Sequence, residues 1–238
     1  MHSIERMIKP RNPSARKRSA SPSTGRTPRR SDEVDTRTAL LDAAEALLLE
    51  EGYGAVTSRR VGERAGANSA LIHYYFESMD GLFVELFRRG AERGLERQGA
   101  ALRSPQPLWA LWDVLHDHIN NVRTVEFFAL AHHRPGIRAE VVEYSAKYRQ
   151  QQLDVLTTVL AGYGLDVDSW PPVTVILMMG SISLLLLIEQ GFGFDAGHAE
   201  MIAVVERQIR EVEGDRWTEH PALARRSRDI SANAAPNR

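Results

Sequence analysis

The chain has 238 residues, which allows one large domain or a small domain followed by a medium one. It contains no cysteine, so disulfides, thiolate metal sites and cysteine nucleophiles are excluded, and a reducing cytoplasm is compatible. The formal net charge is only −1, yet residues 1–30 carry nine Lys or Arg against one acid, a local charge of +8.

Residues 1–32 are rich in Pro, Ser and Arg and have almost no apolar side chains. Such a segment buries too little surface to offset its ordering entropy, so we expect a disordered basic arm. The arm either follows a DNA backbone or enters its minor groove, or it only keeps the protein soluble. Because no apolar run follows its charges, no secretory signal is predicted and we expect a cytoplasmic protein.

A first helix is predicted from about residue 35 to residue 51. Its apolar residues recur at the spacing of three, four and seven that places them on one buried face. They are Leu40, Leu41, Ala44, Leu47 and Leu48. We expect this helix to support the two short helices that follow it.

These two short helices are joined by a tight turn. Thr57 or Ser58 can cap the first of them, and Gly66 can end it in the left-handed conformation. Ile72 and Phe76, four residues apart, form the inner face of the second helix. The outer face is small, polar or aromatic, and two arginines lie near it. This composition is typical of a helix-turn-helix motif with its recognition helix.

Two further helix starts are predicted from capping residues. Asn68 or Ser69 can cap the second short helix, and Ser78 can cap a fourth helix that continues to about Gln98. The fourth helix links the motif to the rest of the chain. We therefore expect it to act as the lever between the two parts.

Six short motifs occur in order within residues 38–86. They are Ala43-Ala44, Glu51-Gly52-Tyr53, Thr57-Ser58, Ala65-Gly66, Tyr74-Tyr75-Phe76, and Ser78 with Leu82. In this order they resemble the TetR family of transcriptional regulators. The resemblance implies an all-α fold with a three-helix DNA-binding domain at residues 33–96, whose helix-turn-helix motif occupies about 57–76.

The resemblance also implies which residues face DNA. They are Thr57, Ser58, Arg59, Arg60, Asn68, Ser69, Ala70, Leu71, His73, Tyr74 and Tyr75. Arg59 is the expected reader of a base edge, because Arg is the commonest bidentate partner of guanine. The chain departs from the family at three positions. His73 replaces a Tyr that commonly touches the DNA backbone, Met79 replaces a Lys, and Leu71 replaces a small hydroxyl residue.

Helical patterning continues after residue 107, and no strand is predicted. The segments are 108–123 with one apolar face, 124–133, 137–161, 173–188 and a last helix that Asp195 can cap. Residues 97–213 are thus expected to form a larger helical domain, which the resemblance identifies as the effector-binding and dimerisation domain. The polar residues 214–238 are predicted to form a disordered tail.

Residues 173–188 are the most apolar segment and permit three interpretations: a dimer interface, the core of one chain, or a membrane span. The segment is shorter than the roughly 20 residues that a bilayer requires, so we expect no membrane. A soluble helix that is apolar nearly all round must be covered on several sides. The resemblance implies a homodimer through the helices at about 171–190 and 196–213.

Large aromatic and partly polar residues are candidates for an effector pocket. They are Trp109, Trp112, His116, Phe127, Phe128, Tyr144, Tyr148 and Met178. Each is also compatible with ordinary core packing. If they line a pocket, the effector is small and fairly hydrophobic, because no phosphate loop or Lys/Arg cluster marks an anionic ligand.

The histidines raise the alternative of a metal site. Asp113 with His116, and Asp195 with His198, place a carboxylate and an imidazole on one helical face. A di-metal bundle needs two further acidic helices in register, and the Gly-x-Ser-x-Gly and His-Glu-x-x-His motifs are absent. We therefore expect no metal, no cofactor and no enzymatic activity.

The resemblance to the TetR family thus implies a dimeric transcriptional repressor that binds a palindromic DNA operator and releases it when a small effector binds. One alternative is an activator or a DNA-binding protein of low sequence preference. The least favoured alternative is a helical-bundle metalloenzyme.

Overall fold

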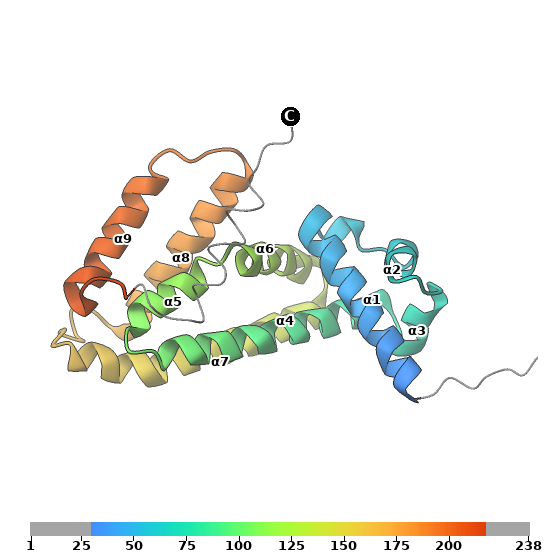
Figure 1. Cartoon of the computed structure of the whole chain (residues 1–238), viewed down its shortest axis with the longest axis horizontal. Coiled ribbons are helices and arrows are strands. Elements are labelled where there is room, and N and C mark those ends of the chain that lie inside the picture. The colour runs from blue at the N-terminus through green and yellow to red at the C-terminus, as the bar shows by residue number, and fades with distance from the viewer. Residues whose placement is uncertain (1–29, 218–238) are drawn as a thin grey trace, which may run out of the picture.

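The computed structural model describes residues 30–217, and all the regular secondary structure in that range is helical (Figure 1). In chain order the elements are α1 (Arg30–Glu51), the 3₁₀ turn η1 (Tyr53–Ala55), α2 (Ser58–Ala65), α3 (Ala70–Phe76), α4 (Met79–Leu102), α5 (Pro107–Leu115), α6 (His118–His133), α7 (Pro135–Gly162), α8 (Pro172–Gly191) and α9 (His198–Glu213). The expected all-α fold is confirmed.

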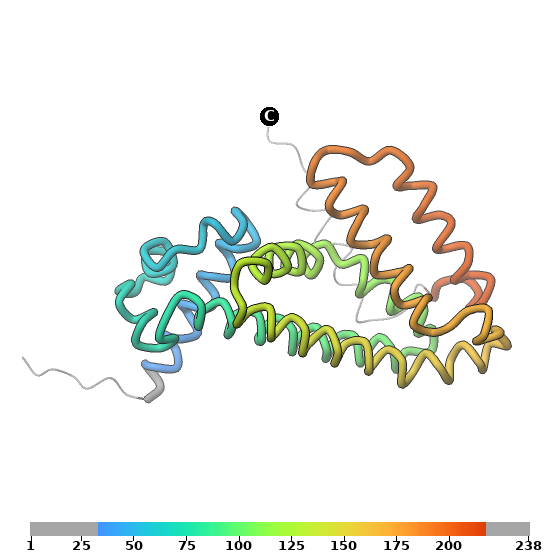
Figure 2. Tube along the Cα trace, turned by 180° about the vertical axis from the view of Figure 1, so that it is seen from behind, coloured from blue at the N-terminus to red at the C-terminus, as the bar shows by residue number. Residues whose placement is uncertain are grey.

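Three groups of helices can be followed in the two views. Helices α1–α3 gather at one end of the molecule, and α4 leaves them and runs beside α7 (Figures 1 and 2). Helices α8 and α9 form a hairpin at the other end, and α6 lies between the two ends. Helices α4 and α6 therefore both reach from the N-terminal helices toward the C-terminal ones.

The predicted arm and tail lie mostly outside the described residues. Helix α1 begins at Arg30, within the last residues of the predicted arm. Residues 214–217 of the predicted tail are described, and they lie against the start of α5. The Gln106 side chain donates a hydrogen bond to the Asp215 carbonyl at 2.9 Å and accepts one from the Trp217 amide at 2.8 Å.

The predicted helix ends near the motif agree with the structure. The Thr57 hydroxyl accepts a hydrogen bond from the Arg60 amide at 3.4 Å, and Ser78 accepts one from the Gly81 amide at 3.0 Å. Gly66 ends α2 with a φ of 64°, a conformation that costs glycine little. At the start of α3, the capping hydrogen bond comes from Asn68, whose Oδ1 accepts from the Ala70 amide at 2.9 Å.

The predicted continuous face over residues 108–123 is wrong, because the chain breaks there into α5 and α6. The Asp117 carboxylate accepts a hydrogen bond from the Asn120 amide at 2.8 Å and so caps a new helix. Ile119, an apolar residue of the segment predicted to have one apolar face, is 54% exposed. The apolar residues keep a helical spacing on both sides of the break, so the spacing alone does not indicate where α5 ends and α6 begins.

The predicted side-chain cap of the last helix by Asp195 is also wrong. Helix α9 begins at His198, and Gly197 precedes it with a φ of 85° and makes no side-chain cap. Asp195 contributes its backbone carbonyl, which accepts a hydrogen bond from the His198 amide at 3.1 Å. The left-handed glycine moves the start of the helix beyond the reach of the carboxylate.

Two separate hydrophobic clusters fill the interior of the described chain. The N-terminal cluster joins α1–α3 to the first half of α4, and it also takes in Phe127, Leu130 and Ala131 of α6 and Ile137 of α7. The C-terminal cluster joins the end of α4 to α5, α7, α8 and α9 around Trp109 and Trp112. Helix α6 thus supplies core residues to the same cluster as the helix-turn-helix motif.

Candidate DNA-binding surface and effector pocket

The helix-turn-helix motif presents one face to the core and one face to solvent. Val61 of α2 and Ile72 and Phe76 of α3 are buried, at 0%, 0% and 6% exposure. None of the predicted DNA-facing residues is buried. Thr57, Arg59, Asn68, Ala70, His73 and Tyr74 are exposed, and Ser58, Arg60, Ser69, Leu71 and Tyr75 are half-buried. The predicted residues are therefore all at least partly accessible, and two of them, Leu71 and Tyr75, also pack against the N-terminal cluster.

A close approach of backbone fixes the angle between α2 and α3. A Cβ atom added to Gly62 would lie 2.9 Å from the Ala67 carbonyl oxygen and 3.0 Å from the Ser69 nitrogen. The Ala67 amide donates a hydrogen bond to the Gly62 carbonyl at 2.9 Å. Only glycine leaves room for this turn, which sets the direction in which α3 projects.

The arginines of α2 differ in their freedom to reach a ligand. Arg60 donates two hydrogen bonds to the Glu51 carboxylate, at 2.6 and 2.9 Å, and Arg64 forms a similar fork on Glu50. Arg59 has an 81% exposed side chain and lies 3.8 Å from Glu63. The guanidinium of Arg59 is therefore free to contact a ligand on this surface, whereas that of Arg60 is paired with Glu51 at the end of α1.

The outer side of α3 carries an imidazole and two phenol rings. The Nδ1 atom of His73 lies 3.2 Å from the Glu77 carbonyl oxygen. A carbonyl oxygen only accepts hydrogen bonds, so Nδ1 carries the proton and donates it. Tyr74 is 68% exposed and meets Tyr75 edge to face at a centroid distance of 4.9 Å. This surface offers polar and aromatic groups at helical spacing.

The turn that precedes the helix-turn-helix motif is hydrogen-bonded directly to α6. The Glu126 carboxylate accepts a hydrogen bond from the Tyr53 amide at 2.7 Å. Gly52 has a φ of 80°, and a Cβ atom there would lie 3.3 Å from the same carboxylate. The glycine thus allows both the turn after α1 and the approach of α6.

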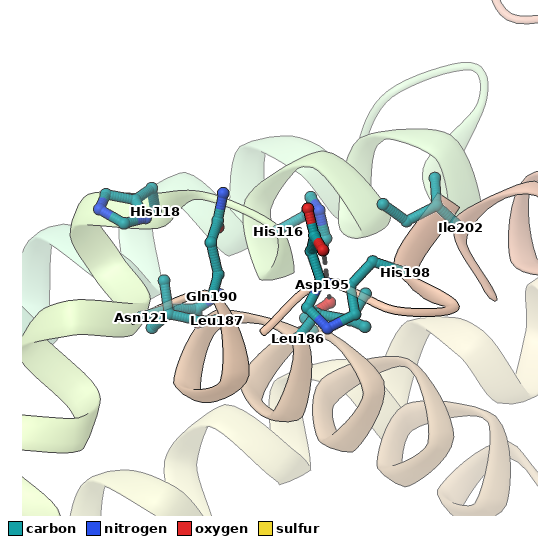
Figure 3. A pocket seen from close by; sticks show the side chains of 10 residues that line it. His116, His118, Asn121, Leu186, Leu187, Gln190, Asp195, His198 and Ile202 are labelled. Carbon is teal, nitrogen blue, oxygen red and sulfur yellow. Dashed lines mark hydrogen bonds between the residues drawn. The ribbon is translucent and has the colours of Figure 1, made fainter. Parts of the chain in front are cut away.

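A cavity of about 420 Å³ lies between the α5–α6 junction and the α8–α9 hairpin (Figure 3). Its lining combines three imidazoles with amide, carboxylate, hydroxyl and aliphatic groups. The lining residues are His116, His118, Asn121, Ser183, Leu186, Leu187, Gln190, Asp195, His198 and Ile202. Its volume lies within the range of roughly 300–1,000 Å³ of small-molecule sites.

Two of the pocket imidazoles are held by neighbours. His116 stacks on Trp112 at a centroid distance of 4.9 Å, and its Nδ1 lies 3.5 Å from the Ser183 hydroxyl. Burial lowers the pKa of His116, against the opposing charges of Glu206 and Asp113. The Nε2 of His198 lies 2.9 Å from a Glu189 oxygen.

Of the eight predicted pocket residues, His116 is the one that lines this cavity. Trp109, Trp112, Phe127 and Tyr144 are buried elsewhere, Tyr148 is half-buried, and Phe128 and Met178 are exposed. The Tyr148 hydroxyl donates to the Ala91 carbonyl at 2.9 Å, and burial raises the pKa of Tyr148 to about 12.

Sequence reasoning missed most of the cavity lining. His118 and Asn121 lie within residues 108–123, the segment predicted to have one apolar face, and Gln190 lies just beyond the apolar segment 173–188. A polar residue at helical spacing from apolar ones was the available signal. Among residues 30–217, no group of three or more His, Cys, Asp or Glu side chains could hold a metal ion.

The α8–α9 hairpin leaves a broad apolar surface uncovered. Leu177, Met178 and Leu185 of α8 are 47%, 45% and 54% exposed, and Met201 and Val204 of α9 are similarly open. Helix α8 has 20 residues, so the expectation that the apolar segment is too short to cross a membrane is wrong. It is the one helix of residues 30–217 long and apolar enough to do so, and 22% of that stretch is buried. A surface of this kind indicates a site of interaction.

Comparison with known proteins identifies the motif region. Residues 40–86 match the family model described as bacterial regulatory proteins, tetR family. No curated protein matches the sequence.

Solved structures share the fold over about three quarters of this chain. A transcriptional regulator from Rhodococcus sp. Rha1 is 19% identical, with a TM-score of 0.55 over 76% of this chain and 95% of that one. FadR from Bacillus halodurans is 16% identical, with a TM-score of 0.56 over 78% and 97%. FadR from Bacillus subtilis, solved with stearoyl-CoA, is 17% identical, with a TM-score of 0.52 over 75% and 99%.

Proposed function

We propose that this chain, a DNA-binding transcriptional regulator of the TetR family, acts as a homodimeric repressor that a small effector releases from a palindromic operator. The α2–α3 surface, in which the Arg59 side chain is exposed and the outer face of α3 is open, is the observation that supports sequence-specific binding most strongly. Residues 33–96 form the proposed DNA-binding domain, and residues 97–213 bind the effector and the second subunit.

In this proposal each contact has a distinct role. Arg59 reads a base edge, preferably guanine, because its guanidinium can donate two parallel hydrogen bonds. Thr57, Tyr75 and the amino ends of the helices hold phosphates, which fixes the register. His73 joins them with both ring nitrogens protonated, since Nδ1 already donates to Glu77 and Nε2 must donate to the phosphate. Arg60 serves mainly to brace α2 against Glu51, since its fork is already occupied.

The uncovered apolar face of α8 and α9 supports a homodimer. Removing this face from water favours association by roughly 25 cal/mol per Å² of apolar area. Two-fold pairing of the hairpins would place two copies of α3 in successive major grooves, about 34–36 Å apart on a palindromic site.

The cavity between α6 and the α8–α9 hairpin is the proposed effector site. Leu186, Leu187 and Ile202 can pack against an apolar body, while imidazoles and amides can bind polar groups. The Bacillus subtilis FadR structure contains stearoyl-CoA, which supports small-molecule control in this fold. Because the lining here includes no Lys or Arg, we propose a smaller effector with few or no negative charges.

Helix α6 supports a route from the effector to DNA. His118 and Asn121 near its start line the cavity, whereas Glu126 and Phe127 further along contact the motif region. A ligand shifts an equilibrium only by its differential affinity for the two states. The effector would therefore favour a position of α6 in which the two motifs no longer match the groove spacing.

Selection of bound sequences from a random DNA pool at physiological salt tests the proposal. A strongly enriched short palindrome is expected, and the enriched site then serves to screen effectors for release. Salt-sensitive binding without enrichment would mean that charge alone drives binding and that the repressor proposal is wrong. An enriched site without inverted symmetry would contradict the two-fold dimer.

A further inference from the structure

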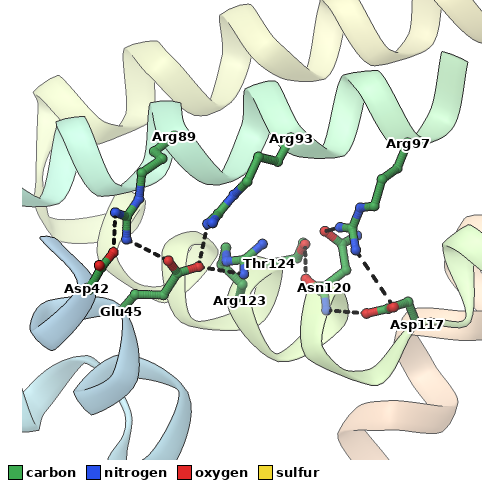
Figure 4. Close-up of polar contacts among 9 residues, drawn as sticks. All are labelled: Asp42, Glu45, Arg89, Arg93, Arg97, Asp117, Asn120, Arg123 and Thr124. Atoms are coloured by element: carbon green, nitrogen blue, oxygen red, sulfur yellow. Dashed lines mark hydrogen bonds and ion pairs between the residues drawn. The ribbon is translucent and has the colours of Figure 1, made fainter. Parts of the chain in front are cut away.

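Four arginines converge where α1, α4 and α6 meet (Figure 4). Arg89, Arg93 and Arg97 are spaced four residues apart along α4, so they form one stripe, and Arg123 faces them from α6. We call these four residues the arginine cluster. The sequence alone did not reveal it, because the fourth member lies on another helix.

The acidic partners of the arginine cluster are fewer than its cations. Glu45 of α1 accepts from Arg89 at 2.6 Å on one oxygen, and from Arg93 at 2.6 Å and Arg123 at 2.7 Å on the other. The remaining charge-paired acids are Asp42, 2.6 Å from Arg89, and Asp117, 3.8 Å from Arg97. Four positive charges therefore meet three negative ones.

The donors of the cluster also exceed its acceptors. The Nε atoms of Arg89, Arg97 and Arg123 are buried and have no hydrogen-bond partner within residues 30–217. The Arg123 side chain is 13% exposed, and burial lowers its pKa, as do the charges of Arg93 and Arg97. Unpaired buried donors and an uncompensated charge both cost free energy, which an added anion would offset.

The cluster is accessible from solvent on one side. The side chains of Arg93 and Arg97 are 49% and 34% exposed, while those of Arg123 and Glu45 are only 13% and 14% exposed. An anion can thus reach the outer guanidinium groups and place an oxygen toward Arg123. Guanidinium groups match the geometry of phosphate oxygens especially well.

We propose that the arginine cluster is a second ligand site and binds a phosphate dianion between Arg93, Arg97 and Arg123. This site is separate from the cavity between the α5–α6 junction and the α8–α9 hairpin. The phosphate belongs either to the free ion or to a phosphate monoester. Bound there, it competes with Glu45 for Arg93 and Arg123. Because Glu45 lies on α1, phosphate occupancy loosens the tie between the motif region and α6.

The test is calorimetric titration of the full chain with sodium phosphate, against sodium chloride at equal ionic strength. We expect saturable binding of phosphate and no saturable binding of chloride. Arg123→Gln should weaken phosphate binding about tenfold or more, because one charge-assisted contact is worth at least that factor. Should Arg123→Gln fail to fold, Arg97→Gln takes its place with the same expectation.

Two further variants separate this site from a general charge effect. Glu45→Gln removes the competing carboxylate and should tighten phosphate binding. Arg88→Gln removes a cation of the same helix that pairs with Glu140 outside the cluster, and it should leave binding unchanged. Titration with glycerol phosphate identifies the source: tighter binding points to a monoester, and equal binding points to the free ion.

The proposal is overturned if the wild-type chain shows no saturable phosphate binding. It is equally overturned if Arg88→Gln weakens binding as much as Arg123→Gln, or if Glu45→Gln fails to tighten it. In each of these three cases the four arginines serve only to hold α1, α4 and α6 together.

Discussion

The two hydrophobic clusters of this chain are completed in different ways. The N-terminal cluster is enclosed by its own helices, with Leu40, Leu48 and Ile72 all at 0% exposure. The C-terminal cluster buries Trp109 and Trp112, but the helices around it leave Leu177 and Leu185 about half exposed. The first region is closed within one chain, whereas the second has an open apolar side.

This difference separates two tasks. In the proposed function the motif region needs a fixed shape, since recognition of base edges depends on the position of α3. In the same proposal the α8–α9 region needs a partner and a ligand, which agrees with its open surface and its cavity of about 420 Å³. Helix α6 joins the regions because its start lines the cavity and its Phe127 is buried in the N-terminal cluster.

The largest predicted effect concerns this joining role. Phe127→Ala should destabilise the chain by about 3–5 kcal/mol, because the ring is fully buried and its removal leaves a cavity. Phe128→Ala is the matched control, since its ring is 43% exposed, and it should cost less than about 1 kcal/mol. Urea unfolding measures both. Equal costs would contradict the assignment of Phe127 to the N-terminal core.

The second prediction concerns the open side. Leu185→Glu should weaken dimerisation by about 3 kcal/mol, because a two-fold interface carries the change twice and buries both charges. Operator binding should fall with it. Val142→Glu, at an exposed position on α7, should leave the dimer intact. Sedimentation over a range of concentrations measures this, and an unchanged dimer in Leu185→Glu would contradict the α8 interface.

The third prediction concerns the two arginines of α2. Arg59→Ala should cost about 1–3 kcal/mol at the selected operator and relax sequence preference at one base pair. Arg60→Ala removes a brace to Glu51 and should weaken binding to all sequences alike. Competition binding against single-base operator variants distinguishes the two. A uniform loss for Arg59→Ala would rule out its base contact.

The smallest prediction is an acid dependence centred on Glu45. Burial alone would raise the pKa of Glu45, but its hydrogen bond from Arg93 and the charges of Arg123, Arg93 and Arg89 outweigh burial and lower it. A lowered folded pKa contributes stability above the unfolded pKa, and this contribution disappears as the pH falls through the folded pKa.

Between about pH 6 and pH 3, the free energy of unfolding of the wild type should therefore fall by on the order of 1 kcal/mol more than that of Glu45→Gln. Glu143→Gln, which removes an exposed i,i+4 partner of Lys147, is the matched control and should keep the acid dependence. Identical acid dependence in wild type and Glu45→Gln would contradict the role of Glu45.

Local signals made the motif region predictable from the sequence. The caps at Thr57 and Ser78, the left-handed Gly66 and the buried Ile72 and Phe76 all depend on residues a few positions apart. The outer face of the motif followed directly from the inner one. The same reasoning found the all-helical character of the rest of the chain.

The cavity and the arginine cluster could not be predicted, since each joins helices far apart in the sequence. The break at Asp117 turns α6 away from α5 and brings His118 and Asn121 opposite Gln190. The capping signal of Asp117 was present, but the apolar spacing of Ile119 outweighed it. Large aromatic residues were likewise candidates for the pocket lining, but Trp109 and Trp112 fill the core and do not line the cavity.

The most direct test of the account is the mass of the protein, free and bound to its selected operator, measured by light scattering. The account predicts twice the chain mass of 26.7 kDa for the free protein, and that mass plus the mass of one operator for the complex. A single chain that binds the operator with full affinity would contradict the claim that the open α8–α9 face is completed by a second copy.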